Sequence, residues 1–392
     1  MHDAVILSGA RTPIGAFLGS LSSVTAPQLG SVAIAEAVKR ANLDPSEIDE
    51  VIMGCVLTGG MGQAPARQAA LGAGLPTSVP ALTINKVCGS AMKAVMLAAQ
   101  AVRLGDSNIV VAGGMESMSN APYVMDKART GYRMGNAKII DSMIHDGLWD
   151  PYKDCHMGNC GDSTSSQLGF SRQQLDEFSA ESYRRAVSAQ AEGRFTDEIV
   201  AVPVPQRKGD PILVSQDEEP GKGNPEKLGT LRAAFSKDGV TTAGNASSID
   251  DGAAALIVAS SEEAEKRGIR PLGRIVGYST YAQEPEWFTT APAFAIEKLL
   301  AKHGLGVQDI DLFEVNEAFA VVAMAVMQKV EIPHDKVNVN GGAVALGHPI
   351  GMTGARLILT ALYELRRRGG RYAIATPCIG GGEATAVLIE AM

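Results

Sequence analysis

The chain has 392 residues, 45% of them hydrophobic and 20% charged, so folding can bury roughly three quarters of the surface that the unfolded chain exposes. Its formal net charge is -8 at pH 7, which argues against a basic, phosphate-neutralising face and therefore against nucleic acid as a partner. The first residues lack a basic segment followed by an apolar run, and we expect no segment with the ~18 apolar residues of a membrane span. We expect a cytoplasmic chain without a membrane partner.

The five cysteines are an odd number in a long chain, which indicates reduced thiols rather than a disulfide framework. The 43 glycines exceed an average share, so the backbone is expected to make many tight turns or close approaches. Any special cysteine is therefore expected to be chemical rather than structural.

The first part of the chain alternates short β-branched runs with alanine-rich helical runs. In chain order this pattern predicts a strand at 4–9, a helix at 27–41, a strand at 50–54, a helix at 88–104 and a strand at 108–113. Strand, helix and strand in this order are typical of an α/β fold with a mostly parallel sheet covered by helices.

The region after residue 272 repeats this plan. It predicts a strand at 273–278, a helix at 293–303, a strand at 311–315, a helix at 352–368 and a strand at 371–376. The residues repeat as well, because segment 35–50 echoes segment 297–312. We infer that a βαβαβ half is duplicated.

The segment between the halves is richer in glycine, proline, serine and charge. Within it, 203–225 has the character of an exposed excursion that could cover a site. We divide the chain into an N-terminal half at 1–118 and 249–271, an inserted loop domain at 119–248 and a C-terminal half at 272–392.

Cys88 stands at the start of helix 88–104, which is apolar on nearly every side and must be buried. A free thiol is only a few per cent thiolate at neutral pH, whereas a helix N-terminus together with a histidine can lower its pKa to roughly 3.5–7.5. Cys88 is therefore a candidate nucleophile. The alternative is packing as a small buried hydrophobe.

His348 is the second candidate and lies in the glycine-rich segment 340–354. This segment lacks the Lys-Ser/Thr ending of a phosphate loop, so a nucleotide cradle is a poor interpretation. Gly347 and Pro349 place the histidine in a rigid turn from which its ring could point into a cleft. A loop histidine with satisfied hydrogen bonds is the alternative.

Two further candidates each follow a predicted strand. Cys378 precedes Gly380, whose amide can converge with those of the next two glycines on an anion. Asn316 opens a helix, so it is either a site residue or the helix N-cap. The segment CHMGNC at 155–160 has metal-ligand residue types but not the paired CxxC spacing, so we expect no metal and assign it to substrate contact or packing.

Four motifs appear together: SGARTP at 8–13, VAGGMESM at 111–118, GNAS at 244–247 with DGA at 251–253, and NEAF at 316–319. With them the whole chain resembles the thiolase family, and within it the acetyl-CoA acetyltransferases. The resemblance implies a duplicated α/β core with layered helices and sheets, an inserted loop domain and a homotetramer built as a dimer of dimers. It implies no cofactor, because coenzyme A is the substrate carrier, and it implies acetyl-CoA and acetoacetyl-CoA as partners.

The resemblance also implies a role for each candidate. Cys88 resembles the nucleophile that becomes acetylated, His348 the group that draws its proton, and Cys378 the acid and base that works on the α-carbon. Asn316 resembles the residue whose bound water forms one oxyanion site with the His348 ring. The amides of Cys88 and Gly380 resemble the other oxyanion site. The expected reaction is a reversible Claisen condensation of two acetyl-CoA to acetoacetyl-CoA and CoA by a ping-pong acetyl-cysteine mechanism.

The family places further residues around coenzyme A. Those implied here are His156, Met157, Ser247, Phe288, Ala318 and Phe319. Glu383 departs from the family because many relatives have a smaller or uncharged residue there, and Thr289 stands where some relatives have proline.

Three rival functions share parts of this pattern. A degradative 3-ketoacyl-CoA thiolase would use the same residues on longer chains. A ketoacyl-carrier-protein synthase would replace Cys378 by histidine or asparagine. A non-catalytic CoA-binding partner would have lost Cys88, His348 or Cys378, and all three are present.

Overall fold

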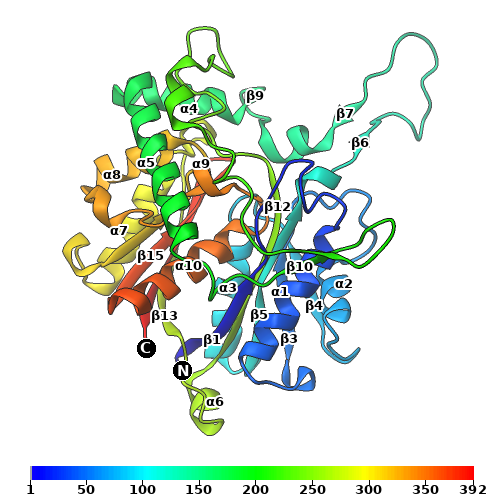
Figure 1. Ribbon diagram of the computed structural model, residues 1–392, viewed down its shortest axis with the longest axis vertical. Coiled ribbons are helices and arrows are strands. Elements are labelled where there is room, and N and C mark those ends of the chain that lie inside the picture. Colours follow the sequence, from blue (N-terminus) through cyan, green and yellow to red (C-terminus); the bar gives the residue numbers. More distant parts are fainter. Residues whose placement is uncertain (1) are drawn as a thin grey trace.

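The structure, a computed structural model, describes residues 2–392 and is organised around one sheet of eleven strands (Figure 1). The strands of this sheet are β1 Ala4–Arg11, β2 Gly15–Ala16, β3 Glu50–Gly54, β4 Ala81–Ile84, β5 Ile109–Ser117, β12 Asp250–Ser260, β13 Gly273–Ala282, β14 Leu312–Val315, β15 Tyr372–Thr376, β16 Cys378–Ile379 and β17 Glu383–Ala391. The two-stranded ribbons are β6 Tyr123–Val124 with β7 Ile140–Asp141, β8 Trp149–Asp150 with β9 Cys155–His156, and β10 Val202–Val204 with β11 Ile212–Val214.

Ten α-helices in the described residues 2–392 pack on this sheet. They are α1 Ala26–Arg40, α2 Pro65–Gly72, α3 Ser90–Leu104, α4 Met157–Leu168, α5 Arg172–Ala191, α6 Ser261–Lys266, α7 Ala291–His303, α8 Ala320–Val330, α9 Ala343–Leu346 and α10 Thr353–Arg368. Every strand and helix predicted from the sequence pattern is present, with ends that shift by a few residues.

The strand order confirms the duplication. Along the sheet the order is β14-β15-β17-β13-β1-β12-β5-β3-β4. Outward from the central pair β1 and β13, the strands β12, β5 and β3 on one side match β17, β15 and β14 on the other. Each half therefore repeats one plan of strands, with β4 as an addition at the edge of the first half.

The prediction of a mostly parallel sheet is wrong. The pairs β3–β4, β3–β5 and β14–β15 are parallel, whereas β1–β12, β1–β13, β5–β12, β13–β17 and β15–β17 are antiparallel. The reason is that an antiparallel strand lies between strands that a βαβ unit would place side by side. In the first half β12 separates β1 from β5, and in the second half β17 separates β13 from β15.

Two helices lie in the middle of the molecule. Helices α3 and α10 contact each other, and both contact strands of the two halves, whereas α1 and α2 pack on the first half and α7 and α8 on the second. The molecule is therefore layered. In order, the layers are the outer helices of the first half, the strands of that half, helices α3 and α10, the strands of the second half and the outer helices of the second half. This layering buries α3 among apolar side chains, as its all-round apolar pattern predicted.

The central position of α3 also explains a long apolar segment. Residues 87–104 form an 18-residue stretch that is long and apolar enough to cross a membrane by composition. The expectation that no segment reaches this length is therefore wrong. In the fold this stretch is the core helix between the half-sheets, and such helices pass the same test.

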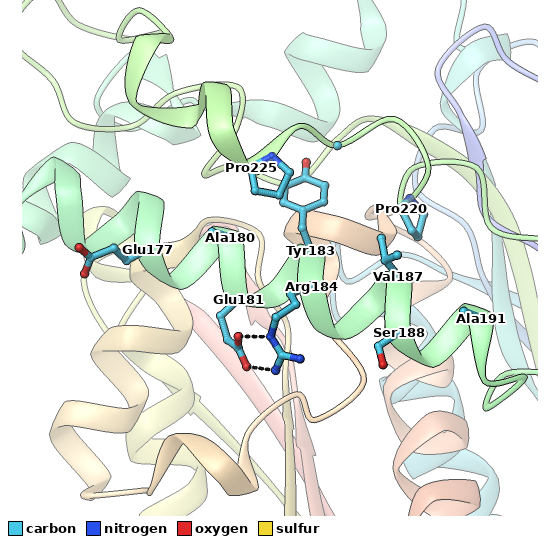
Figure 2. Close-up of a pocket in the computed structure, with 11 residues that line it drawn as sticks. Glu177, Ala180, Glu181, Tyr183, Arg184, Val187, Ser188, Ala191, Pro220 and Pro225 are labelled. Carbon is cyan, nitrogen blue, oxygen red and sulfur yellow. Dashed lines mark hydrogen bonds and ion pairs between the residues drawn. The ribbon is translucent and has the colours of Figure 1, made fainter.

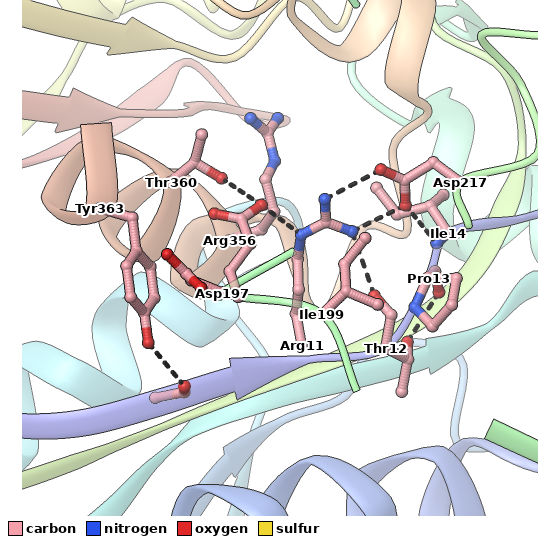
Figure 3. A network of polar contacts seen from close by, with 12 residues as sticks. Arg11, Thr12, Pro13, Ile14, Asp197, Ile199, Asp217, Arg356, Thr360 and Tyr363 are labelled. Carbon is pink, nitrogen blue, oxygen red and sulfur yellow. Dashed lines mark hydrogen bonds and ion pairs between the residues drawn. The ribbon is translucent and has the colours of Figure 1, made fainter. Parts of the chain in front are cut away.

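A buried ion-pair cluster ties the inserted segment to the core (Figure 3). Arg11 in β1 donates from Nε to Glu198 at 2.6 Å and from its two terminal nitrogens to Asp217 at 2.7 and 2.9 Å. All three side chains are buried. The excursion predicted at 203–225 is exposed over 205–213, but it returns to the core at Asp217. The domain boundaries themselves stay a prediction.

Candidate active site

Cys88 lies in a tight turn between β4 and α3. The side-chain oxygen of Asn85 accepts the N–H of Val87 at 2.9 Å. The Ser90 hydroxyl accepts the N–H of Lys86 at 2.8 Å and donates to the carbonyl of Val87 at 2.7 Å. Val87 has φ 45°, a left-handed conformation that costs on the order of 1–3 kcal/mol and is especially unfavourable for a β-branched residue. Hydrogen bonds therefore hold a strained turn that places Cys88 just before α3.

The surroundings of Cys88 favour its protonated thiol. Burial raises its pKa to about 11, although the N–H groups of Gly380 and of Cys88 itself favour the thiolate, and the carboxyl of Glu116 adds to the increase. A helix N-terminus together with a histidine can lower the pKa of a thiol, but at Cys88 desolvation outweighs the two amides. The nucleophile therefore needs a base.

Two contacts, one of the backbone and one of the ring, fix His348 in the buried loop between α9 and α10. Asp250 Oδ2 accepts the backbone N–H of His348 at 2.8 Å. The ring Nδ1 is 2.7 Å from Thr353 Oγ1, and that hydroxyl donates to the carbonyl of Pro349 at 2.9 Å. Because backbone and ring are held separately, the orientation of the imidazole is fixed.

The hydrogen-bond network assigns the tautomer of His348. Its Nε2 is 3.2 Å from the side-chain nitrogen of Asn316. An amide N–H only donates, so we assign Nε2 as the acceptor and place the ring proton on Nδ1, which donates to Thr353. Burial, with a smaller effect of the Arg356 charge, lowers the pKa of the ring to about 3. The imidazole is therefore neutral at pH 7, with a lone pair on Nε2.

Asn316 is not a helix cap. It lies directly after β14, its backbone N–H donates to the carbonyl of Thr376 at 3.0 Å, and α8 begins only at Ala320 with Phe319 as its N-cap. The cap interpretation is wrong because three residues intervene. Asn316 is fully buried, and its Oδ1 has no hydrogen-bond partner among residues 2–392. Such an orphaned oxygen costs about 1–3 kcal/mol and indicates a place for a water or a bound molecule.

Cys378 and Gly380 lie in a glycine hairpin beside Cys88. Burial raises the pKa of the Cys378 thiol well above its ordinary value, and a charge on Cys88 raises it further. The two segments are in contact, because a Cβ placed on Gly89 would lie 2.3 Å from the side chain of Ile379. Gly381 and Gly382 have φ 92° and 88°, a conformation open to glycine without strain. They return the chain from β16 to β17 and leave the N–H of Gly380 directed at the Cys88 sulfur.

The nucleophile turn and the histidine loop meet at the N-terminus of α3. A Cβ placed on Gly54 would lie 2.8 Å from the carbonyl oxygen of Gly351 and 2.6 Å from the Cβ of Ser90. The histidine loop and the start of α3 therefore both pack against Gly54. Ile350 also packs in one hydrophobic cluster with Cys88. The structure thus gathers into one region the five predicted catalytic residues, Cys88, His348, Cys378, Asn316 and Gly380.

A row of rings connects three of the six residues expected around coenzyme A. His156 stacks on Phe235 with ring centroids 4.6 Å apart. Phe235 meets the edge of Phe319 at 6.0 Å. Phe319 in turn meets the edge of Phe288 at 6.5 Å. Sequence reasoning missed Phe235, because nothing in its neighbourhood distinguishes it from a core phenylalanine.

The remaining expected contacts join the same region. Met157 lies against Gly380, where an added Cβ would be 3.4 Å from the methionine methyl. Ser247 donates to the carbonyl of Ala318 from both its N–H at 3.0 Å and its hydroxyl at 3.1 Å. The expected coenzyme A contacts therefore extend from the glycine hairpin, which Met157 contacts, to the start of α8, where Ser247 bonds Ala318.

Glu116 is a second residue that the sequence reasoning missed. Its carboxylate oxygens accept the N–H groups of Val56 at 3.0 Å and Leu57 at 3.1 Å, and Gly351 lies directly against it. Burial raises its pKa to about 7. A lone acid in the apolar strand β5 was the available signal.

The structure brings no metal ligands together in the part that it describes. No group of three or more His, Cys, Asp or Glu side chains suited to a metal ion occurs among residues 2–392. In segment 155–160, Cys160 Sγ is 3.9 Å from Asp150 Oδ2, and Cys155 pairs with Asp150 in the β8–β9 ribbon. These are local packing contacts.

A groove of about 760 Å³ lies on the outer face of α5 (Figure 2). The helix lines it with Tyr183 and Val187, and the inserted segment closes it with Pro220 and Pro225. None of its lining residues belongs to the predicted site. This groove is therefore separate from the place where the catalytic candidates meet.

Comparison with known proteins gives the relationships of the chain. The description "Thiolase, N-terminal domain" matches residues 4–262, and "Thiolase, C-terminal domain" matches residues 269–391. Acetyl-CoA acetyltransferase 2 of Arabidopsis thaliana is 52% identical over 391 residues, which cover 99% of this chain and 97% of the relative. Acetyl-CoA acetyltransferase of Cupriavidus necator is 49% identical over 391 residues, with 100% of both chains covered.

Solved structures agree with these matches. The Acat5 thiolase from Ascaris suum in complex with coenzyme A has a TM-score of 0.95 and 42% identity over 100% of both chains. The Bacillus anthracis acetyl-CoA acetyltransferase has a TM-score of 0.98 and 42% identity over 100% of this chain and 99% of that one. The chain belongs to the thiolase family.

Proposed function

We propose that this chain is an acetyl-CoA C-acetyltransferase, which reversibly joins two acetyl-CoA molecules into acetoacetyl-CoA and CoA. Relatives of that name cover almost the whole chain at 52% and 49% identity. The observation that carries the proposal is a pair of thiols on two segments in contact, of which Cys378 is buried and Cys88 partly buried. Of the two, Cys88 alone also receives the N–H of Gly380. One thiol is thus equipped to hold an acyl group and the other to move a proton.

In the first half-reaction the Cys88 sulfur attacks the carbonyl carbon of acetyl-CoA, and its proton passes to Nε2 of His348. The carbonyl oxygen becomes negative beside the amides of Cys88 and Gly380, and each such donor contributes about 10² to 10³ in rate. The bond from the acetyl carbon to the CoA sulfur then breaks. Cys378 gives its proton to the departing CoA thiolate, which leaves as the thiol. The products are acetyl-Cys88, protonated His348 and the Cys378 thiolate.

In the second half-reaction the Cys378 thiolate removes a proton from the methyl group of a second acetyl-CoA. Its high proton affinity, a consequence of burial, suits the removal of a proton from carbon. The carbanion attacks the acetyl carbon on Cys88, and the carbon-sulfur bond breaks. The Cys88 sulfur then takes back the proton from His348, so acetoacetyl-CoA forms and all protons return.

The enolate oxygen of that second step needs its own donors. After the first half-reaction Nε2 of His348 carries a proton and has changed from acceptor to donor. The unpartnered Oδ1 of Asn316 can accept one hydrogen of a water whose other hydrogen points to the enolate. This division of roles explains why Asn316 is buried next to the ring but incompletely bonded.

The experiment that tests this function compares substrates. We expect kcat/KM in the thiolysis direction to be at least tenfold higher for acetoacetyl-CoA than for a long-chain 3-ketoacyl-CoA. Equal or higher values for the long chain would favour the degradative thiolase. No turnover of either by a folded protein that binds coenzyme A would favour the non-catalytic partner.

We also propose that the chain works as a homotetramer in a reducing, cytoplasmic compartment. Strand β4 ends the sheet and leaves Leu82 42% exposed, and the β6–β7 arm projects from the body with Met134 97% exposed (Figure 1). An open strand edge and an apolar arm are surfaces suited to pairing with further copies. All five cysteines are free. Light scattering should give four times the chain mass, and a stable monomer would contradict the assembly.

A further inference from the structure

Lys86 and Glu383 form an ion pair at the edge of the site, between the segment that carries Cys88 and the hairpin that carries Gly380. Their side chains are 24% and 35% exposed. Lys86 is the sole charged residue between positions 68 and 92, and Glu383 is the sole one between 372 and 389. Two charges that stand alone in uncharged stretches therefore meet each other.

The two ends of this pair differ in rigidity. Glu383 begins β17, where it pairs with Ile379 of β16 and with Ala282 of β13. Lys86 belongs to the strained turn, because it directly precedes Val87 with its left-handed backbone. The pair therefore ties a strained turn to a strand that is bonded on both sides.

The Cys88 turn and the Gly380 hairpin are also in direct contact, at residues that lie between the ion pair and the Cys88 sulfur. A Cβ placed on Gly89 would lie 2.3 Å from the side chain of Ile379, and one placed on Gly380 would lie 3.8 Å from the side chain of Val87. There is thus little space between them. A small separation of the segments would move the N–H of Gly380 away from the Cys88 sulfur.

We propose that the Lys86–Glu383 ion pair is a positioning pair that holds the Cys88 turn against the Gly380 hairpin and so keeps the oxyanion donors aligned. This inference rests on the proposed acetyl transfer at Cys88. A partly exposed ion pair contributes little to folding stability by itself. Its effect is expected in catalysis instead, because a displacement of about 1 Å in a site can cost about 10²-fold in rate.

The pair has an electrostatic consequence that a purely structural contact would lack. Removal of one partner leaves the other as an unbalanced charge near Cys88. This charge is positive when Glu383 is removed and negative when Lys86 is removed. The other titratable groups that act on the Cys88 and Cys378 thiols are Glu116 and these two thiols themselves, and they stay the same in every variant. An unpaired Lys86 favours the Cys88 thiolate, whereas an unpaired Glu383 disfavours it.

The test uses Lys86→Gln, Glu383→Gln and the exchanged pair Lys86→Glu with Glu383→Lys. We expect each single variant to lower kcat about tenfold with a smaller change in KM, and the exchanged pair to recover to within about threefold of the parent. The pH midpoint of Cys88 alkylation by iodoacetamide should move down in Glu383→Gln and up in Lys86→Gln. Alkylation requires no turnover, so it tests the pair even if the proposed function fails.

Glu47→Gln is the matched control. It breaks the ion pair of Glu47 with Arg267, whose side chains are 33% and 24% exposed, and which joins α6 to the turn Pro45–Glu47 near the chain termini (Figure 1). This variant should change neither kcat nor the alkylation midpoint. The proposal is overturned if the single variants behave like this control, if the exchanged pair is no better than the worse single variant, or if both midpoints move the same way.

Discussion

Burial moves the proton affinities of the site residues in opposite directions. It raises the pKa of Cys88 to about 11 and that of Cys378 well above its ordinary value, and it lowers the pKa of His348 to about 3. In each case the neutral form is favoured, because a buried charge loses its hydration. The resting site is therefore uncharged at both thiols and at the imidazole, and charge separates only when substrate arrives.

The buried neutral ring of His348 predicts a pH dependence of stability. Its folded pKa of about 3 lies below the ordinary value of 6.5, so its contribution is complete above pH 6.5 and is lost as the pH falls from 6.5 towards 3. Between pH 7.5 and 5.5 the loss is about 1–2 kcal/mol in the free energy of unfolding. Urea unfolding of the parent and of His348→Asn at both pH values measures it.

The comparison of the parent with His348→Asn cancels the pH-dependent stability that the buried acids contribute. Glu116, with a pKa raised to about 7, acts with the opposite sign, since its contribution is complete below pH 4.5 and is lost as the pH rises through 7. That background is common to parent and variant. If both lose the same stability between the two pH values, His348 is not buried as a neutral ring.

Asn316→Asp tests the contact that fixes the tautomer. The change keeps the side-chain shape but places a carboxylate about where the amide nitrogen lies 3.2 Å from Nε2. The carboxylate favours a proton on Nε2, so this nitrogen can no longer accept the Cys88 proton. We expect condensation to fall by at least about 10²-fold. Nitrogen-15 spectra of labelled histidine should show Nε2 protonated at pH 7, and unchanged spectra with normal activity would exclude the role.

Sequence reasoning identified the site residues better than it identified their surroundings. Cys88, His348 and Cys378 lie next to glycines or prolines that mark special turns, so their positions stood out. Phe235 and Glu116 could not be identified in this way, because their importance comes from contacts across the fold. The cap interpretation of Asn316 failed because strand β14 and helix α8 are separated by a short irregular segment that no residue pattern revealed.

At the scale of elements, the site is a meeting point of chain segments from both halves and the insert. Helix α4 brings His156 and Met157, the start of α8 brings Phe319, and the turn before α7 brings Phe288. Their rings and side chains pack as a row that ends at the Gly380 hairpin. The width of the acyl pocket is therefore expected to depend on large side chains in this row.

Phe288→Ala should widen that pocket. Phe288 is buried with its ring against Phe319, so its removal leaves space for additional methylene groups. We expect the ratio of kcat/KM for a six-carbon 3-ketoacyl-CoA to that for acetoacetyl-CoA to rise at least about tenfold, since each buried methylene contributes about 0.8 kcal/mol. Phe294→Ala, on α7 and stacked on Tyr281 instead, is the control. A ratio that changes equally in both variants would place Phe288 outside the pocket.

The elements that the sequence pattern failed to predict are those whose partners are distant. β12 is rich in alanine, so its composition does not distinguish strand from helix. It pairs with β1 and β5, and the inserted segment separates it from β5 by more than a hundred residues. Local alternation of strand and helix therefore suggested a parallel sheet, and long-range pairing made it mixed.

The whole molecule is a duplicated core joined to its insert through buried charges. Arg11 belongs to the central strand β1, whereas Glu198 and Asp217 belong to the insert. Asp217 also accepts the backbone N–H of Ile14 at 2.8 Å. The duplication was predictable because both halves retain similar residues, but this cluster was not, because its members lie about two hundred residues apart in the chain.

Arg11→Met should destabilise the protein strongly. The change removes the cation and leaves two acids buried without their partner, which costs about 3–5 kcal/mol. The thermal midpoint should fall by several degrees. Arg184→Met breaks the exposed ion pair with Glu181 and should leave the midpoint nearly unchanged. Equal midpoints for the two variants would show that the cluster does not anchor the insert.

The central claim is that Cys88 carries the acetyl group and Cys378 moves the α-proton. Intact-mass measurement after a short pulse of acetyl-CoA tests it most directly, with Cys88→Ser and Cys378→Ser measured beside the parent. The account predicts one added acetyl group in Cys378→Ser, because Cys88 and His348 remain, and none in Cys88→Ser, because a serine hydroxyl is a far weaker nucleophile at neutral pH. Loss of acetylation in Cys378→Ser as complete as in Cys88→Ser, or stable acetylation of Cys88→Ser, would contradict it.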